Sequence, residues 1–228
     1  MGYQTVLERV RAEAVACGRD PKEITVIAVS KGRSVKQILQ VYREGCRHFG
    51  ENRLNEYLEK CDQLPGDISW DMIGKIQSKK VRKVVCDGVF SLIHSVDSPQ
   101  LVEKIHEASA EEVKISSILL QVNVSGEISK QGLSIPEWRE VIEEVCCHTF
   151  VRICGLMTMA PIDASEAEAE KIFSQLREFL VEIRSSSRID FETHPLDELS
   201  MGMSQDFPAA IRAGATLLRI GSAIFDKA

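Results

Sequence analysis

Short apolar runs alternate with longer amphipathic segments along the whole chain. The runs cover residues 24–30, 46–50, 69–74, 89–96, 116–124, 151–158, 195–201 and 215–221. Segments with apolar residues at helical spacing lie between the runs, at 35–44, 51–61, 77–86, 99–109, 136–147, 165–184 and 207–213, and one more, 5–16, precedes the first run. The pattern therefore predicts eight strands separated by helices, with an additional helix at the N-terminus.

This order of elements indicates a closed parallel sheet. Strands separated by helices pair in parallel through right-handed crossovers, and eight such units close into a (β/α)8 barrel of about 250 residues. The rival fold, an open doubly wound sheet, would need a glycine-rich phosphate turn after the first strand, and VSKGRS (29–34) is not one. No Gly/Ser-rich linker divides the 228 residues. We expect an α/β fold consisting of one TIM-type barrel with an extra N-terminal helix.

Charge and cysteine usage narrow the class of protein. The net charge of −6 disfavours nucleic-acid and anionic-membrane binding, and no apolar stretch is long enough to span a bilayer. The N-terminus mixes charged and apolar residues, unlike a signal peptide. Seven cysteines without a CxxC pair are typical of a reducing compartment, and the five histidines lack metal-ligand spacing. We expect a cytoplasmic protein without a metal site, a membrane or a nucleic-acid partner.

A lysine ends the first buried run, ITVIAVSK. In a barrel, side chains at the carboxyl ends of the strands converge on one mouth, where active sites are built. A lysine there can attack a carbonyl group once it has lost its proton, and burial or cationic neighbours favour that loss. The alternative is that Lys31 simply solvates the end of a strand.

The loops after the seventh and eighth strands, LSMGMSQDF and RIGSAIF, are rich in small residues. Barrels often bind phosphate between these two loops through backbone N–H groups and a short helix N-terminus. The glycines could instead only permit tight turns. The candidate phosphate-binding residues are Ser200, Gly202, Met203, Ser204, Gly221 and Ser222.

Arg219 lies two residues before Gly221, so strand alternation turns its side chain toward the same face as that loop. A lone arginine at this position could be a structural ion-pair partner. Beside a reactive lysine and a phosphate loop, it suits the ring nitrogen of pyridoxal phosphate (PLP), which proteins pair with either Asp or Arg. Arginine does not readily give up a proton, so the nitrogen would stay neutral.

Eight ordered motifs carry a family resemblance: AVSKGRS, HFGEN, IGKIQSKK, HSVDS, QVNVSGEISKQGL, GLMTMAP, LSMGMSQDF and RIGSAIF. In their order and spacing the chain resembles the YggS/PROSC family of pyridoxal phosphate homeostasis proteins. The resemblance implies one PLP-binding barrel domain over residues 1–228, similar to the N-terminal domain of bacterial alanine racemase. It also implies that Lys31 holds the cofactor as a Schiff base.

The resemblance also implies roles for other residues. The phosphate-binding positions match Ser200, Met203, Gly221 and Ser222, the ring-nitrogen arginine matches Arg219, and the pocket asparagine matches Asn52. Lys130 matches a position linked in the family to cofactor handling outside the main pocket. Asn55 and Lys79 depart from the family pattern, and the tail after Phe225 is short, which puts pocket-edge contacts and tail packing in question.

Efficient catalysis is not expected. Racemisation needs acid/base groups on both faces of the substrate, and alanine racemases take a tyrosine from a second domain. Here Tyr3, Tyr42 and Tyr57 all fall in helical patterns. We expect a monomeric PLP-binding protein of intracellular PLP homeostasis, with no assigned catalytic residue and with apo forms of PLP enzymes as candidate partners.

Three alternatives remain at this point. A PLP-dependent amino acid racemase of low activity could use Lys31 alone. A Schiff-base aldolase would need a carboxylate or a second lysine around Lys31, and Glu51 and Asp97 lie near strand ends, although each suits a helix cap. An interaction protein could use the barrel only as a scaffold, but the intact lysine, arginine and glycines argue against that.

Overall fold

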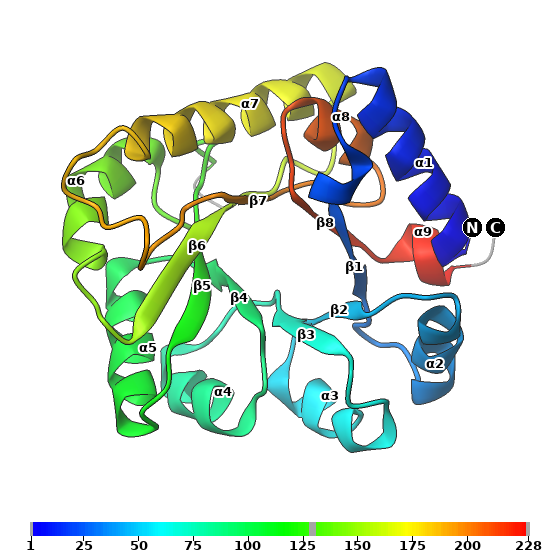
Figure 1. The fold of residues 1–228 in the computed structure, drawn as a ribbon, viewed down its shortest axis with the longest axis horizontal. Coiled ribbons are helices and arrows are strands. Elements are labelled where there is room, and N and C mark those ends of the chain that lie inside the picture. Colours follow the sequence, from blue (N-terminus) through cyan, green and yellow to red (C-terminus); the bar gives the residue numbers. More distant parts are fainter. Residues whose placement is uncertain (1, 128–130, 227–228) are drawn as a thin grey trace.

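The structure, a computed structural model, describes residues 2–127 and 131–226, so Lys130 lies outside the described residues. Its strands close into one parallel barrel in the order β1 to β8, which confirms the expected fold (Figure 1). The strands are β1 (Thr25–Val29), β2 (His48–Glu51), β3 (Ser69–Met72), β4 (Leu92–Val96), β5 (Ser116–Gln121), β6 (Val151–Met157), β7 (Glu198–Ser200) and β8 (Leu217–Ile220).

Helices form a ring around the strands (Figure 1). They are α1 (Tyr3–Ala16), α2 (Val35–Arg43), α3 (Leu54–Leu58), α4 (Val81–Asp87), α5 (Pro99–Glu111), α6 (Ile135–Val145), α7 (Glu166–Ile183), α8 (Phe207–Arg212) and α9 (Ser222–Phe225), with short 3-10 turns at Pro21–Glu23, Cys61–Gln63 and Ser78–Lys80. The N-terminal helix α1 packs against α8 and α9, so the two ends of the described chain lie side by side. Among the described residues, no helix combines the length and apolar character needed to cross a bilayer.

Three helices begin at capping boxes that the sequence encodes directly. In α2, α6 and α7 the N-cap serine accepts a hydrogen bond from the third helical N–H, and the side chain of that third residue accepts one from the N-cap backbone. This reciprocal pairing satisfies two backbone donors that would otherwise lack partners, so it sets where the helix starts. The pairs are Ser34 with Gln37, Ser134 with Glu137 and Ser165 with Glu168.

The structure corrects two expected elements. The helix expected over 51–61 is wrong at its start, because β2 continues through Glu51 and α3 covers only Leu54–Leu58. The eighth strand, expected over 215–221, covers only Leu217–Ile220, and it is followed by a short helix, α9, that the sequence analysis did not predict. Both errors arise where a strand end and a helix start carry the same mixture of apolar and polar residues.

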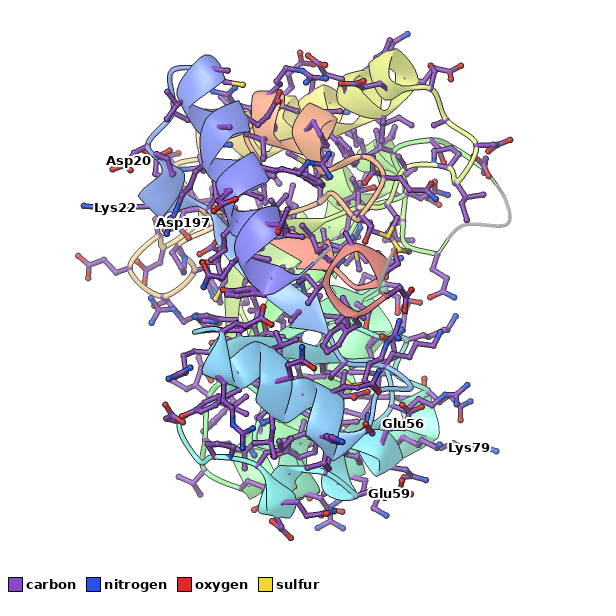
Figure 2. All side chains as sticks on the ribbon, turned by 90° about the vertical axis from the view of Figure 1, so that its right-hand side faces the viewer. Asp20, Lys22, Glu56, Glu59, Lys79 and Asp197 are labelled. Carbon is purple, nitrogen blue, oxygen red and sulfur yellow. The ribbon has the colours of Figure 1, made fainter. Side chains whose placement is uncertain are left out.

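The apolar core has two parts. The larger part fills the space between the strands and the helical ring. Inside the barrel, a smaller cluster of Ile27, Leu119, Met157 and Leu217 closes the pore. Figure 2 separates the two ends of the barrel: Asp20, Lys22 and Asp197 precede strands and lie on the left, whereas Glu56 and Lys79 follow strands and lie toward the right. The candidate residues belong to this second end, the mouth at the carboxyl ends of the strands.

Candidate functional site

Lys31 lies in a tight turn at the mouth of the barrel. Strand β1 ends at Val29, and Arg33 N–H donates to the carbonyl oxygen of Ser30 at 2.9 Å, which closes a four-residue turn. Gly32 has a φ of +67°, a left-handed conformation that glycine adopts without strain. The side chain of Lys31 is exposed, as an amine that receives a ligand from solution must be.

A buried ion pair lies directly behind this turn. The carboxylate of Glu51, which is 0% exposed, accepts from the Ser30 hydroxyl at 2.8 Å and from Lys60 Nζ at 2.6 Å. Lys60 Nζ also donates to the carbonyl oxygen of Ser30 at 3.2 Å. Sequence analysis missed Lys60 and treated Glu51 as a possible helix cap. The two residues are nine positions apart and meet only because β2 and the end of α3 fold together.

One hollow opens beside Lys31, with a volume of about 330 Å³. Asn52 lines it, and its Oδ1 atom is buried without a hydrogen-bond partner in the described structure, so an acceptor is available to a bound ligand. Asn55 also lines this hollow, whereas Lys79 is exposed outside it, so only the first of the two departures concerns the site. The charged residues in the lining are all cations: Lys31, Arg53, Lys75 and Lys80.

A second hollow lies between the loops that follow β6, β7 and β8. It contains four of the expected cofactor-binding residues: Met203, Arg219, Gly221 and Ser222. Two backbone N–H groups of these loops already donate to side-chain oxygens. Met203 N–H donates to Asp206 Oδ1 at 2.6 Å, and Ala223 N–H donates to Ser204 Oγ at 3.2 Å.

Gly202 shapes the turn that leads into the second hollow. Its φ is +93°, and a Cβ atom there would lie 2.6 Å from the Cβ atom of Ala210. A side chain would therefore strain the backbone and collide with helix α8. Gly202 thus permits the close packing of this loop on α8. This role agrees with the alternative in which the glycines of these loops only permit tight turns.

Arg219 is buried inside the barrel and hydrogen-bonded at both ends of its guanidinium group. Nη1 donates to Ser200 Oγ, and Nη2 donates to the carbonyl oxygen of Thr158 at 3.0 Å. Burial lowers the pKa of Arg219 to about 10, so the group stays protonated at neutral pH. Ser200 faces Arg219 in this interior network, and Ser200 does not line either hollow.

The network continues across the barrel to two residues that sequence analysis did not assign. Ser200 Oγ, which accepts from Arg219, also forms a hydrogen bond with His94 Nδ1 at 2.8 Å. The other ring nitrogen of His94 lies 3.5 Å from Asp71 Oδ2, longer than a hydrogen bond. Burial lowers the pKa of His94, so the ring is neutral near pH 7.

The two hollows flank the end of β1. Val29 lines the second hollow, and Lys31, two residues later, lines the first. Strand β1 also pairs with β8, where Ile27 is opposite Arg219. The chemistry of these residues suits a ligand that carries an aldehyde and a ring nitrogen: Lys31 supplies an amine, Arg219 a cation that suits a neutral ring nitrogen, and Asn52 an unpaired acceptor for a hydroxyl or amine.

A closed parallel barrel with a lysine after β1 and a buried arginine on β8 agrees with the alanine racemase type of barrel that the sequence motifs implied. The family model "Alanine racemase, N-terminal domain" matches residues 12–227. The curated "Pyridoxal phosphate homeostasis protein" of Vibrio alginolyticus is 36% identical over 225 residues, which cover 96% of this chain and 93% of the relative. The chain therefore belongs to the pyridoxal phosphate homeostasis proteins of this barrel family.

Solved structures agree with this assignment. PipY of Synechococcus elongatus, solved with PLP bound, is 35% identical, has a TM-score of 0.81, and matches over 95% of this chain and 99% of its own. Alanine racemase of Corynebacterium glutamicum has a TM-score of 0.70 at 14% identity, over 96% of this chain and 60% of its own. The second match shows a shared fold only.

Proposed function

We propose that this protein binds pyridoxal 5'-phosphate and acts in intracellular PLP homeostasis, with the cofactor held as a Schiff base on Lys31. The observation that carries the proposal is that Lys31, in the turn after β1, and the buried, protonated Arg219, on the neighbouring strand β8, lie at one mouth. The names of the curated relatives and the PLP-bound PipY structure support it. In this proposal residues 1–228 are a single PLP-binding domain.

Each candidate residue has a defined task in this proposal. PLP supplies an electrophilic aldehyde when it is bound, and Lys31 supplies the amine. Arg219 would face the ring nitrogen and keep it unprotonated, because a guanidinium group donates hydrogen bonds and gives up no proton near pH 7. Asn52 contributes its unpaired Oδ1 to the pocket beside Lys31.

The phosphate would be held by backbone groups of the second hollow. Met203, Gly221 and Ser222 line this hollow. In this proposal Ser200 also contributes to phosphate binding, and it orients Arg219 through their hydrogen bond. Phosphate binding at Met203 N–H requires that Asp206 share or release that donor, since the Asp206 carboxylate accepts it at 2.6 Å. In the absence of phosphate, the Asp206 carboxylate satisfies the Met203 N–H, which would otherwise lack a hydrogen-bond acceptor.

The racemase alternative lacks a second acid/base group. Tyr3 and Tyr57 are buried, and the hydroxyl of Tyr42 donates to Asp67 at 2.8 Å. None of these three tyrosines lines either hollow. This arrangement supports a binding protein over an efficient racemase, because proton transfer on both faces of a substrate needs a group within reach of each.

The aldolase alternative predicted a carboxylate or a second lysine near Lys31, and Glu51 and Lys60 do lie there. Both are buried, are hydrogen-bonded to each other and to the turn, and line neither hollow. Asp97, the other candidate, lies 3.6 Å from Lys75 Nζ as an ion pair. A group without access to the ligand cannot transfer its proton, so this cluster does not favour an aldolase.

The proposed setting is the cytoplasm, with the protein as a monomer that passes the cofactor to apo forms of PLP enzymes. It has no nucleic-acid or membrane partner in this proposal. The net charge of −6 supports that view, since a polyanion or an anionic membrane would be repelled.

An absorbance spectrum with added PLP tests the proposed function. We expect a band that borohydride reduction converts into a stable adduct, which peptide mapping locates on Lys31. Lys31→Ala should lose the adduct, whereas Lys36→Ala, a change of an exposed lysine on α2, should retain it. A Lys31→Ala protein that binds PLP as tightly and forms the same adduct would falsify the assignment. Incubation with D- and L-alanine should show slow racemisation at most.

A further inference from the structure

The residues on either side of Lys31 are held from outside the barrel. Side chains alternate along β1, so Ile27 packs inside the pore while Ala28 and Ser30 face the helical layer. Glu51, at the end of β2, faces the same layer. The support for the Lys31 turn is therefore separated from the mouth by the sheet itself.

Three charged groups hold the turn. Glu51 Oε1 accepts from Ser30 Oγ at 2.8 Å, and Lys60 Nζ donates to the carbonyl oxygen of Ser30 at 3.2 Å. On the far side of Lys31, Gly32 N–H donates to Glu56 Oε2 at 2.9 Å, and this bond lowers the pKa of Glu56. Lys60 Nζ lies 3.6 Å from the same Glu56 oxygen, so one ammonium group joins both halves of the support.

This arrangement is costly for a protein that needs only stability. Ser30 and Glu51 are 0% exposed and Lys60 is 9% exposed, and buried ion pairs contribute little or nothing relative to apolar residues of the same volume. What such a pair does supply is directionality, because hydrogen bonds to charged groups restrict angle as well as distance. The two atoms of Ser30 that bond this pair, Oγ and the carbonyl oxygen, belong to the residue next to Lys31.

Since Glu51 and Lys60 line neither hollow, they act on the cofactor only through other residues. We propose that the Glu51–Lys60 ion pair, together with Glu56, positions Lys31: it fixes the backbone of the Ser30–Arg33 turn so that the amine is presented at the mouth. This inference rests on the proposed function, and it makes Glu51, Glu56 and Lys60 positioning residues.

The test uses the double variant Glu51→Gln/Lys60→Met, which removes both charges with little change in shape and leaves no buried charge unpaired. We expect its midpoint of thermal unfolding to stay close to that of the wild type. The rate at which PLP forms a borohydride-trapped adduct on Lys31 should fall about tenfold, the effect of losing one charged hydrogen bond. Lys60→Arg, which keeps the cation, should retain most of the rate.

A matched control removes an ion pair elsewhere. Arg139 and Glu182 join α6 to α7 on the outer surface, with Arg139 Nε 2.5 Å from Glu182 Oε1. The variant Arg139→Gln/Glu182→Gln should leave the adduct rate unchanged. A similar slowing in this control would overturn the inference, because the effect would then follow from lost charge in general.

A double-mutant cycle separates positioning from general damage. PLP affinity is measured in the wild type and in Lys31→Ala, each with and without Glu51→Gln/Lys60→Met. If the pair acts through Lys31, Glu51→Gln/Lys60→Met should lower PLP affinity in the wild-type background. In the Lys31→Ala background the same double variant should change PLP affinity by less than about twofold. An equal loss in both backgrounds, or an unchanged adduct rate in the folded double variant, overturns the inference. The wild-type adduct reports the proposed function separately.

Discussion

The guanidinium group of Arg219 on β8 donates a hydrogen bond to the hydroxyl of Ser200 on β7, inside the barrel and close to its mouth. The two residues are 19 positions apart, and the parallel pairing of their strands brings them together. The contact links a loop expected to bind phosphate to the arginine expected at the ring nitrogen. One serine thus couples two parts of the candidate site.

Removing the Ser200 hydroxyl should destabilise the protein. Ser200→Ala leaves Arg219 Nη1 and His94 Nδ1 without their shared buried partner, at a cost of about 1–3 kcal/mol in the free energy of unfolding. Urea denaturation measures this loss. Ser204→Ala is the control, because Ser204 is partly exposed and its hydroxyl oxygen accepts a hydrogen bond from the Ala223 N–H. Equal stability of the Ser200→Ala protein and the wild type would contradict the network.

Changing Arg219 should alter the spectrum of bound PLP without abolishing the lysine adduct. In Arg219→Glu a carboxylate faces the ring nitrogen and favours its protonation, as Asp does in other PLP proteins. We expect a shifted absorption maximum and a retained borohydride adduct on Lys31. The variant also replaces a donor to Ser200 and Thr158, so its folding is checked by circular dichroism. An unchanged spectrum in the folded variant would count against the role given to Arg219.

Gly32→Ala should weaken cofactor attachment through backbone strain alone. Gly32 has a φ of +67°, and a Cβ atom there would meet nothing within 4 Å, so the cost is the left-handed conformation, about 1–2 kcal/mol. The turn should relax and the adduct on Lys31 should form more slowly. Gly18→Ala is a matched control, because Gly18 has a φ of +72°, equally open space and a position after α1, away from the mouth. Slowing of the adduct by both variants to the same extent would show that position in the turn does not matter.

The buried His94 predicts a loss of stability on acidification. Burial lowers its pKa in the folded protein, whereas the unfolded chain takes up a proton near pH 6.5. Below that pH the unfolded state binds more protons, so the free energy of unfolding falls with decreasing pH, by at most about 1.4 kcal/mol per pH unit for this group.

Denaturation in urea between pH 7.5 and about 5 measures that slope. His94→Gln keeps a hydrogen-bonding side chain opposite Ser200 and should reduce the slope. Part of it should remain, because burial lowers the pKa of His148 and His194 as well. His48→Gln, at an exposed position, is the control. A slope that is the same in His94→Gln and the wild type would mean that folding does not lower the pKa of His94.

The amphipathic pattern of the chain was sufficient to predict the barrel. Period and length distinguish a strand such as 116–124 from a helix such as 165–184, and capping serines mark where helices start. Strand alternation also placed Arg219 on the same side as Gly221, and both line the second hollow. These features depend on neighbours in the sequence, so the sequence alone carries them.

Only the tertiary structure shows which distant side chains meet. No local pattern joins Glu51 to Lys60 and Ser30, or Arg219 to Ser200 and His94, because each of these contacts depends on strand register and on how closely a helix end approaches the sheet. Local sequence determines the period of an element, whereas burial and pairing of charges depend on the closed barrel. For that reason the sequence predicted Lys31 as the reactive group, and the fold revealed what holds the turn that carries it.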